Sequence, residues 1–134
     1  AAHGGPYVAT ASASHLQDLV RKVEKAKGIR GTRIVTVLIP CLDGWGLPDD
    51  AGLTAARYAV ECGAFPLYEI EDATRYTMSV TEKTRPVSDY LALQRRYRGL
   101  PDADVATLQA EIDAGWARLV ERARASRSET MRAA

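Results

Sequence analysis

The chain has 134 residues, which is enough for one domain with a single hydrophobic core. Hydrophobic residues make up 46% of the sequence and charged residues 26%, a balance that is typical of folded globular proteins and excludes wholesale disorder. The 18 Lys and Arg residues nearly cancel the 17 Asp and Glu residues, and a net charge of +1 predicts neither nucleic-acid nor membrane binding.

The features that report on cellular location agree with one another. The longest apolar run, Ile34 to Cys41, is too short to span a bilayer. The first residues lack the basic and apolar regions of a signal peptide. Two cysteines cannot form the disulfide scaffold of a small secreted domain. The sequence therefore predicts a cytoplasmic protein with reduced thiols.

The first half of the chain alternates between strand and helix patterns. A short strand is predicted over Tyr7–Ala11, and a helix with Ser14 as its N-cap follows and ends at Gly28. The apolar residues of this helix share one face: Leu16, Leu19, Val20, Val23 and Ala26. Ile34–Ile39 is almost continuously apolar, which predicts a strand buried on both faces, as in a parallel sheet.

A loop and a second helix are expected next. The segment Pro40–Pro48 is rich in Pro and Gly, which predicts a loop. Asp49 or Asp50 is the expected start of a helix that ends at Gly63, with Leu53 among its packing residues.

The remainder of the chain predicts a hairpin and two further helices. Phe65–Ile70 and Arg75–Val80 read as strands on either side of an acidic turn, an arrangement typical of an antiparallel hairpin. Pro86 begins a short helix, and Pro101 precedes a long one. The apolar stripe of the long helix repeats every three or four residues: Val105, Leu108, Ile112, Trp116 and Leu119.

This order of elements predicts the α/β class, with a mostly parallel sheet, flanking helices and a long amphipathic helix at the end. We expect one domain over residues 1–124, followed by a polar, frayed tail over residues 125–134.

Few residues suggest chemistry by themselves, because the common nucleotide-binding, hydrolase and metalloprotease motifs are absent. Cys41 directly follows a predicted strand, where ligands of α/β proteins usually bind, so it is either a thiolate ligand or nucleophile or a structural cysteine. Trp45 either shields a cofactor or anchors its loop. Cys62 is interpreted as a packing residue. The acidic residues Glu69, Glu71 and Asp72 are interpreted as solvated groups rather than as acid/base groups or metal ligands.

Several segments in a shared order resemble one family. They are Ala2–Ser12, Asp18–Ala26, Pro40-Cys41 before Gly44-Trp45, Phe65–Glu69 and Arg85–Gln94. Together they resemble the C-terminal part of the beta subunit of pyruvate:ferredoxin oxidoreductase (pyruvate synthase) and of related 2-oxoacid:ferredoxin oxidoreductases. The resemblance runs from Ala2 to about Leu119. After the acidic turn the family favours Gly, where this chain has Ala73.

The resemblance implies the C-terminal portion of a thiamine-diphosphate-binding domain. It implies an enzyme that converts pyruvate and coenzyme A to acetyl-CoA and CO₂, with electrons passed through iron–sulfur clusters to ferredoxin. The implied cofactors are thiamine diphosphate with Mg²⁺ and a [4Fe–4S] cluster, held mainly by residues outside this chain. The implied partners are the alpha, gamma and delta subunits of the complex and ferredoxin, with no nucleic acid and no membrane.

The resemblance also implies roles for three residues. Cys41 matches the fourth cysteine ligand of the [4Fe–4S] cluster, and Gly44 and Trp45 are expected around that ligand. The family's thiamine motif and its first three cluster cysteines are not found here, so we expect the chain alone to be inactive. Two alternatives are a non-catalytic interaction domain and the same enzyme class acting on 2-oxoisovalerate, 2-oxoglutarate or oxalate.

Overall fold

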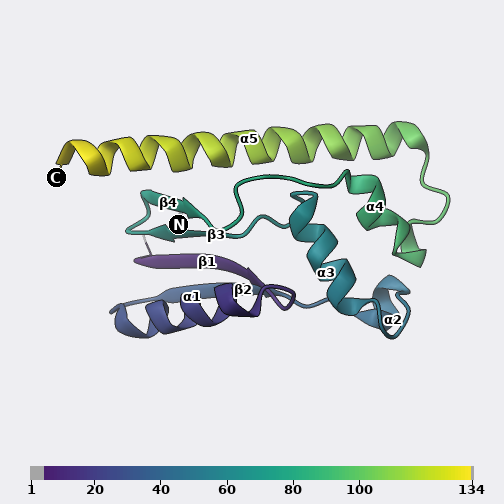
Figure 1. Cartoon of the computed structure of the whole chain (residues 1–134), viewed down its shortest axis with the longest axis horizontal. Helices are drawn as coiled ribbons and strands as arrows, with labels where there is room; N and C mark the ends of the chain where they lie inside the picture. Colours follow the sequence, from purple (N-terminus) through teal and green to yellow (C-terminus); the bar gives the residue numbers. More distant parts are fainter. Residues whose placement is uncertain (1–4, 134) are drawn as a thin grey trace.

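Four short strands form one sheet at the centre of the computed structural model, which describes residues 5–133 (Figure 1). The strands are β1 (Tyr7–Ser12), β2 (Arg33–Leu38), β3 (Tyr68–Glu71) and β4 (Arg75–Met78), and they lie in the order β2-β1-β3-β4. The α/β class is confirmed, and each predicted strand is present with small shifts at its ends. The first residues of the Ala2–Ser12 motif lie outside the described residues.

The sheet is mostly antiparallel, which corrects the expectation of a mostly parallel one. Only β1 and β2 pair in parallel, through helix α1 (Leu16–Gly28), whereas β1–β3 and β3–β4 are antiparallel. The helices α2 (Leu42–Trp45) and α3 (Gly52–Glu61) lie beyond the end of the sheet, at the right of Figure 1. The chain therefore re-enters the sheet at the end where β2 stops, so β3 runs in the opposite direction.

The second half of the chain packs around α3. The short helix α4 (Val87–Ala92) and the 3-10 turn η1 (Arg95–Tyr97) precede the long helix α5 (Asp102–Ala133). Cys62, Val87 and Leu91 form a buried cluster. Tyr90, Tyr97 and Leu100 pack against this cluster, together with the first three residues of the predicted α5 stripe: Val105, Leu108 and Ile112. The packing role of Cys62 is confirmed.

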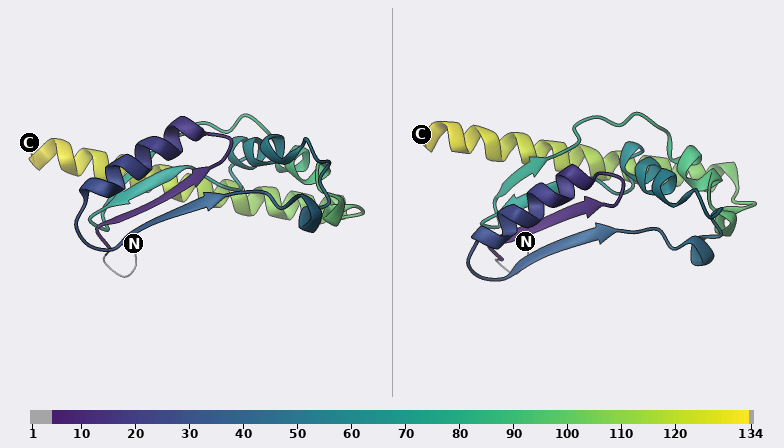
Figure 2. Two further views of the ribbon diagram at one scale, coloured as in Figure 1. Left: turned by 90° about the horizontal axis from the view of Figure 1, so that it is seen from below. Right: turned by 60° about the horizontal axis from the view of Figure 1, so that its bottom comes forward.

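Helix α5 runs along the whole molecule beside the β3–β4 hairpin (Figures 1 and 2). The predicted long helix is confirmed, and it continues past residue 124, where the sequence predicts a frayed tail. The buried Ser126 hydroxyl accepts a hydrogen bond from the Tyr76 amide at 3.1 Å and so attaches this part of α5 to β4. The domain boundary at residue 124 stays a prediction.

Two predicted helix starts and one predicted loop need correction. The N-cap of α1 is His15 rather than Ser14, whose hydroxyl instead contacts the His15 ring at 2.9 Å. Helix α3 begins after Ala51, beyond Asp49 and Asp50. The predicted loop after β2 contains the short helix α2, which a run of Gly and Pro conceals from pattern analysis.

The largest differences from expectation concern apolar residues near β2. This strand lies at the edge of the sheet, and it is not buried on both faces, because Ile34 is 51% exposed. On α1, Leu16 is 64% and Val20 is 59% exposed, and Leu53 of α3 is 59% exposed. The physical reason on α1 is that its charged side, rather than its apolar side, is bonded to the sheet.

The turn between β3 and β4 contains a local strain. Asp72 has φ of 50° and Ala73 has φ of 61°, a left-handed conformation that costs a residue with a Cβ more than it costs glycine. We predict that Ala73→Gly raises the free energy of unfolding by about 1 kcal/mol, measured by urea denaturation. Ala103→Gly, in the first turn of α5, is the control and is expected to lower stability. Equal effects at both positions would contradict the prediction.

No helix among residues 5–133 combines the length and the apolar character needed to cross a membrane.

Candidate functional site

Cys41 occupies the N-cap of α2, directly after the chain leaves β2. Its backbone is extended, and its Sγ accepts a hydrogen bond from the Gly44 amide at 3.3 Å. The helix ends at Trp45, and the amide of the following Gly46 donates to the Asp43 carbonyl at 3.1 Å. Cys41 is exposed, and its turn already supplies one backbone donor to its sulfur.

Two glycines fix the shape of this turn. A Cβ at Gly44 would lie 3.1 Å from the Cys41 Sγ, so a side chain there would press on the sulfur. Gly46 has φ of 63°, and a Cβ there would lie 2.7 Å from the Cβ of Arg95. Gly44 thus lies against the Cys41 sulfur, and its place around a cluster ligand stays a prediction. Gly46 and Arg95 were not predicted as part of the site, because their contact joins distant parts of the chain.

Trp45 packs between two elements from the second half of the chain. The Arg96 guanidinium carbon lies 4.4 Å from the centre of the Trp45 ring, and the Tyr90 ring meets it edge-on at 6.4 Å. The Arg96 Nε donates to the buried Gln94 side chain at 2.9 Å, which orients the guanidinium. Trp45 therefore anchors the Cys41 turn to α4 and η1, as one of its two interpretations predicted.

We predict that Arg96→Met loosens this anchor. Loss of the exposed cation–π contact should cost about 0.5–1 kcal/mol of stability and make Trp45 more accessible to acrylamide. Acrylamide quenching of tryptophan fluorescence is measured in a Trp116→Phe background, where Trp45 is the only tryptophan. Arg98→Met is the matched control, because Arg98 stacks on no ring among the described residues. Unchanged quenching in Arg96→Met would contradict the anchor.

The side chains of the described residues suit one ligand of an iron–sulfur cluster and no more. A [4Fe–4S] cluster usually takes four thiolates, and the exposed, amide-bonded Cys41 sulfur suits that role. Cys62 is fully buried, and burial raises the pKa of its thiol, so it is unsuited to metal binding. Residues 5–133 contain no group of three or more His, Cys, Asp and Glu side chains that could hold a metal ion. The other ligands would have to come from elsewhere.

A network of buried ion pairs lies between α1 and the sheet, and sequence reasoning missed it. Glu69 is 2% exposed, which corrects its interpretation as a solvated acid. Its carboxylate accepts from the Tyr7 hydroxyl at 2.7 Å and from Arg21 at 2.9 Å. The fully buried Lys22 donates to Asp18 at 2.5 Å and to the Thr10 carbonyl at 2.8 Å.

The network shifts the pKa values of its members in opposite directions. Burial alone would raise the pKa of Glu69, but hydrogen bonds from Tyr7 and Arg21 and the charge of Lys25 outweigh it, so this pKa is lowered. Burial and the hydrogen bond to Glu69 raise the pKa of Tyr7. Each charge has a partner, so the network holds α1 on the sheet and offers no free acid or base.

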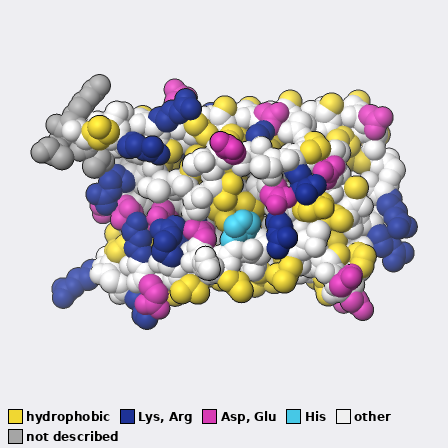
Figure 3. Space-filling model, viewed as in Figure 1, with side chains coloured by type: hydrophobic (Ala, Val, Ile, Leu, Met, Phe, Trp, Pro, Cys, Tyr) yellow, Lys and Arg dark blue, Asp and Glu magenta, His cyan; other side chains and the backbone are white. Residues whose placement is uncertain are grey.

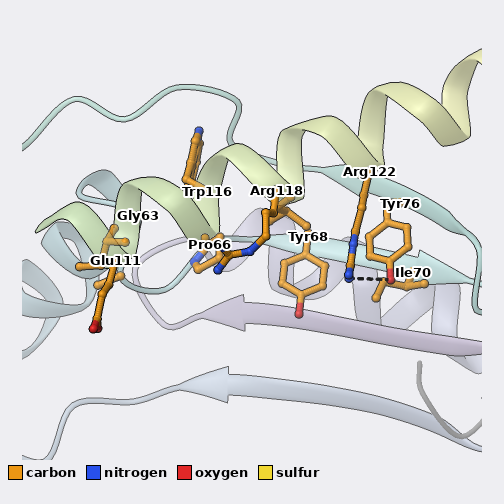
Figure 4. A pocket seen from close by; sticks show the side chains of 13 residues that line it. Gly63, Pro66, Tyr68, Ile70, Tyr76, Glu111, Trp116, Arg118 and Arg122 are labelled. Carbon is orange, nitrogen blue, oxygen red and sulfur yellow. Dashed lines mark hydrogen bonds between the residues drawn. The ribbon is translucent and has the colours of Figure 1, made fainter. Parts of the chain in front are cut away.

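A groove of about 570 Å³ lies between α5 and the β3–β4 hairpin (Figure 4). Figure 4 shows Tyr68, Tyr76, Arg118 and Arg122 along it, with Arg122 donating to the Tyr76 hydroxyl at 3.5 Å. It contains none of the residues that the sequence predicts for the site. Its side chains form a mixed apolar and basic surface without a nucleophile.

Comparison with known proteins supplies the class. No protein-family model matches the chain. It is 48% identical over 113 residues to pyruvate synthase subunit PorB of Methanocaldococcus jannaschii, covering 84% of this chain and 38% of that subunit. It is 41% identical over 113 residues to PorB of Methanothermobacter marburgensis, covering 84% of this chain and 39% of that subunit. The relatives are thus subunits of oxidoreductases.

A further relative is named for a substrate other than pyruvate. The chain is 36% identical over 121 residues to ketoisovalerate oxidoreductase subunit VorB of Pyrococcus furiosus, covering 88% of this chain and 39% of that subunit. The predicted resemblance to the beta subunit of the 2-oxoacid:ferredoxin oxidoreductases is therefore confirmed over most of the chain. The chain spans 38% to 39% of the length of these three relatives.

Proposed function

We propose that this chain is part of the beta subunit of a 2-oxoacid:ferredoxin oxidoreductase and that its substrate is pyruvate. The 48% identity to a pyruvate synthase subunit is the observation that carries the proposal. The complete enzyme would convert pyruvate and coenzyme A to acetyl-CoA and CO₂ and pass the electrons to ferredoxin. It would act as a complex with alpha, gamma and delta subunits, and this chain alone would be inactive.

In this proposal Cys41 is one thiolate ligand of a [4Fe–4S] cluster, which supplies electron transfer when bound. The Gly44 amide donates to the ligand sulfur, and such donors help to set reduction potentials. Trp45, held by Arg96, keeps the turn in place and excludes water from one side of it. Thiamine diphosphate with Mg²⁺ would be held by residues outside this chain.

The decisive experiment is Cys41→Ser in the assembled enzyme. We expect iron per complex to fall and ferredoxin reduction to be largely lost, because a serine oxygen is a poor replacement for a thiolate. Cys62→Ala is the matched control and should leave the iron content unchanged, because Cys62 is buried in the core. Iron and ferredoxin reduction at the wild-type level in Cys41→Ser would contradict the ligand role.

A second candidate substrate is 2-oxoisovalerate, which the similarity to a ketoisovalerate oxidoreductase subunit favours. Both substrates have the same reacting 2-oxoacid group and differ in the size of the side chain. A comparison of kcat/KM for pyruvate, 2-oxoisovalerate and 2-oxoglutarate on the assembled enzyme decides between them. A preference for a branched substrate would replace pyruvate and leave the role of Cys41 intact.

A non-catalytic interaction domain is the alternative outside the enzyme class. The genes beside the one for this chain distinguish the two. An adjacent gene that encodes the remaining cluster cysteines and a thiamine motif supports the enzyme, and a complex assembled from both products should bind iron. The absence of such a gene would favour the interaction domain.

A further inference from the structure

The groove between α5 and the β3–β4 hairpin carries side chains of the types that dominate protein interfaces. We call it the α5 groove. Tyr68 and Tyr76 line it from the hairpin, and Trp116, Arg118 and Arg122 line it from α5 (Figure 4). Tyrosine, tryptophan and arginine are the residues that contribute most binding energy where two proteins meet. The composition of the α5 groove therefore favours a protein as its ligand.

The hairpin presents its tyrosines to α5 because side chains of a strand alternate between two faces. Glu69 lies on the face covered by α1, where Arg21 binds it. Its neighbours Tyr68 and Ile70 therefore lie on the opposite face, and both line the α5 groove. Tyr76 pairs with Ile70 in the register of β3 and β4, so it shares this face. Strand alternation thus builds an aromatic and apolar floor beneath the arginines of α5.

The arginines of the α5 groove lack acidic partners. Among the side chains that the structure describes, no carboxylate lies within ion-pair distance of Arg118 or Arg122. The Arg122 guanidinium carbon instead lies over the Tyr76 ring, 5.7 Å from its centre. The α1 side of the sheet differs, because Arg21 and Lys22 both bind carboxylates there. Figure 3 shows Lys and Arg side chains beside Asp and Glu side chains on the face that carries α1. Guanidinium groups without a counter-charge attract acids, so the α5 groove favours an acidic ligand.

The binding surface is elongated. A second groove of about 300 Å³ continues along α5, and Tyr76 lines both grooves. From Glu111 to Arg127 the two grooves follow α5 for about 24 Å along the helix axis. The described residues of α5 that line them include three arginines and one glutamate: Arg118, Arg122, Arg127 and Glu111. A basic surface of this length suits a stretch of polypeptide better than a compact small molecule.

We propose that the α5 groove binds an acidic segment of another subunit of the oxidoreductase. Arg118 and Arg122 lie about one helical turn apart, so they pair with two carboxylates spaced by about 6 Å. An apolar side chain of the same segment packs on Tyr68 and Ile70. This role rests on the part of the proposed function that makes the chain a subunit of a larger enzyme, and it requires neither a particular 2-oxoacid nor the role of Cys41.

Charge reversal in the assembled enzyme tests the electrostatic contact. Arg118→Glu combined with Arg122→Glu should lower the amount of complex by about tenfold or more, measured by native mass spectrometry, because like charges would then face each other. Arg124→Glu is the matched control, since this exposed arginine of α5 lines neither groove, and it should leave the complex intact. Arg118→Lys keeps the charge and should retain most of the complex.

The folding of the variants is checked by circular dichroism. Arg118 and Arg122 are both exposed, so the double variant should keep the helix content of the wild type. Arg118→Glu alone breaks no ion pair among the described side chains, and it should weaken the complex in the same direction.

A photocrosslinker in the α5 groove identifies what binds there. With p-benzoylphenylalanine in place of Tyr68, irradiation of the assembled enzyme should attach this chain to a segment of another subunit that is rich in Asp and Glu. Mass spectrometry of the digested product locates that segment. Attachment within the same subunit, or to a segment without acidic residues, would overturn the proposal.

The two proposals fail in different ways. If the wild-type chain enters no complex, the proposed function fails together with the role of the α5 groove. If the complex forms and the double variant assembles as well as Arg124→Glu does, only the role of the α5 groove fails.

Discussion

Replacing Asp18 by asparagine is expected to lower the free energy of unfolding by about 3–5 kcal/mol. Asp18 is the carboxylate partner of Lys22, whose side chain has no exposed area. The Lys22 Nζ lies 2.5 Å from the Asp18 Oδ2. Without the carboxylate, the ammonium group keeps only the Thr10 carbonyl, 2.8 Å away, as a strong acceptor. A buried charge without a counter-charge is among the most destabilising changes in a protein interior.

Two further variants separate this effect from a general loss of ion pairs. Lys22→Met removes the buried charge itself and leaves Asp18 bonded to Arg21, so it should cost much less than Asp18→Asn. Glu24→Gln breaks the exposed pair with Lys27 and should change stability by less than about 0.5 kcal/mol. Urea denaturation of the three variants measures the order of their losses in free energy of unfolding. Equal losses in Asp18→Asn and Glu24→Gln would contradict the buried-charge argument.

The same network is expected to make the fold sensitive to acid. The pKa values of Glu69 and Asp18 lie below their ordinary values of 4.5 and 3.8. Carboxyls with a lowered folded-state pKa stabilise the fold above their unfolded pKa, and this stability is lost as pH falls through the folded value. The free energy of unfolding should therefore be nearly constant between about pH 5 and pH 8 and fall steadily below pH 4.5.

Glu69→Gln tests which carboxyl carries this dependence. The variant should be less stable at pH 7, because Arg21 and Lys25 lose their shared counter-charge. Its stability should then decline less between pH 4.5 and pH 3, since one titrating group is gone. Glu111→Gln, at an exposed residue of α5, is the control and should keep the wild-type profile. A slope in Glu69→Gln as steep as in the wild type would contradict the assignment.

Local patterns predicted the elements of this fold well. The spacing of Val105, Leu108 and Ile112 indicated α5, and the acidic turn indicated the β3–β4 hairpin. The position of Cys41 at the end of a strand was readable as well, because a strand pattern stops abruptly at Pro40. These features depend on neighbours in the sequence, which is the range over which periodicity and turn chemistry act.

The features that escaped prediction depend on contacts between distant segments. Glu69 looks like a solvated acid in sequence, and only its 2.7 Å contact with Tyr7, 62 positions away, shows that it is buried. The apolar run of β2 predicts burial correctly only if both faces of the sheet are covered there, and Ile34, on the face opposite to the one where Val35 lies beside α1, is 51% exposed. The contact of Arg96 with Trp45 likewise joins η1 to α2, which no local pattern connects.

The close approach at Gly46 constrains how this region can vary between relatives. The Cβ that a larger residue would bring lies 2.7 Å from the Cβ of Arg95, and the backbone φ of 63° is itself unfavourable for other residues. The closest of the contacts is with the Cβ of Arg95, an atom that any residue except glycine would place there, and the Cγ and Cδ of Arg95 lie 3.3 Å from the same point. Among related chains we therefore expect the residue at position 95 to vary, whereas position 46 should remain glycine.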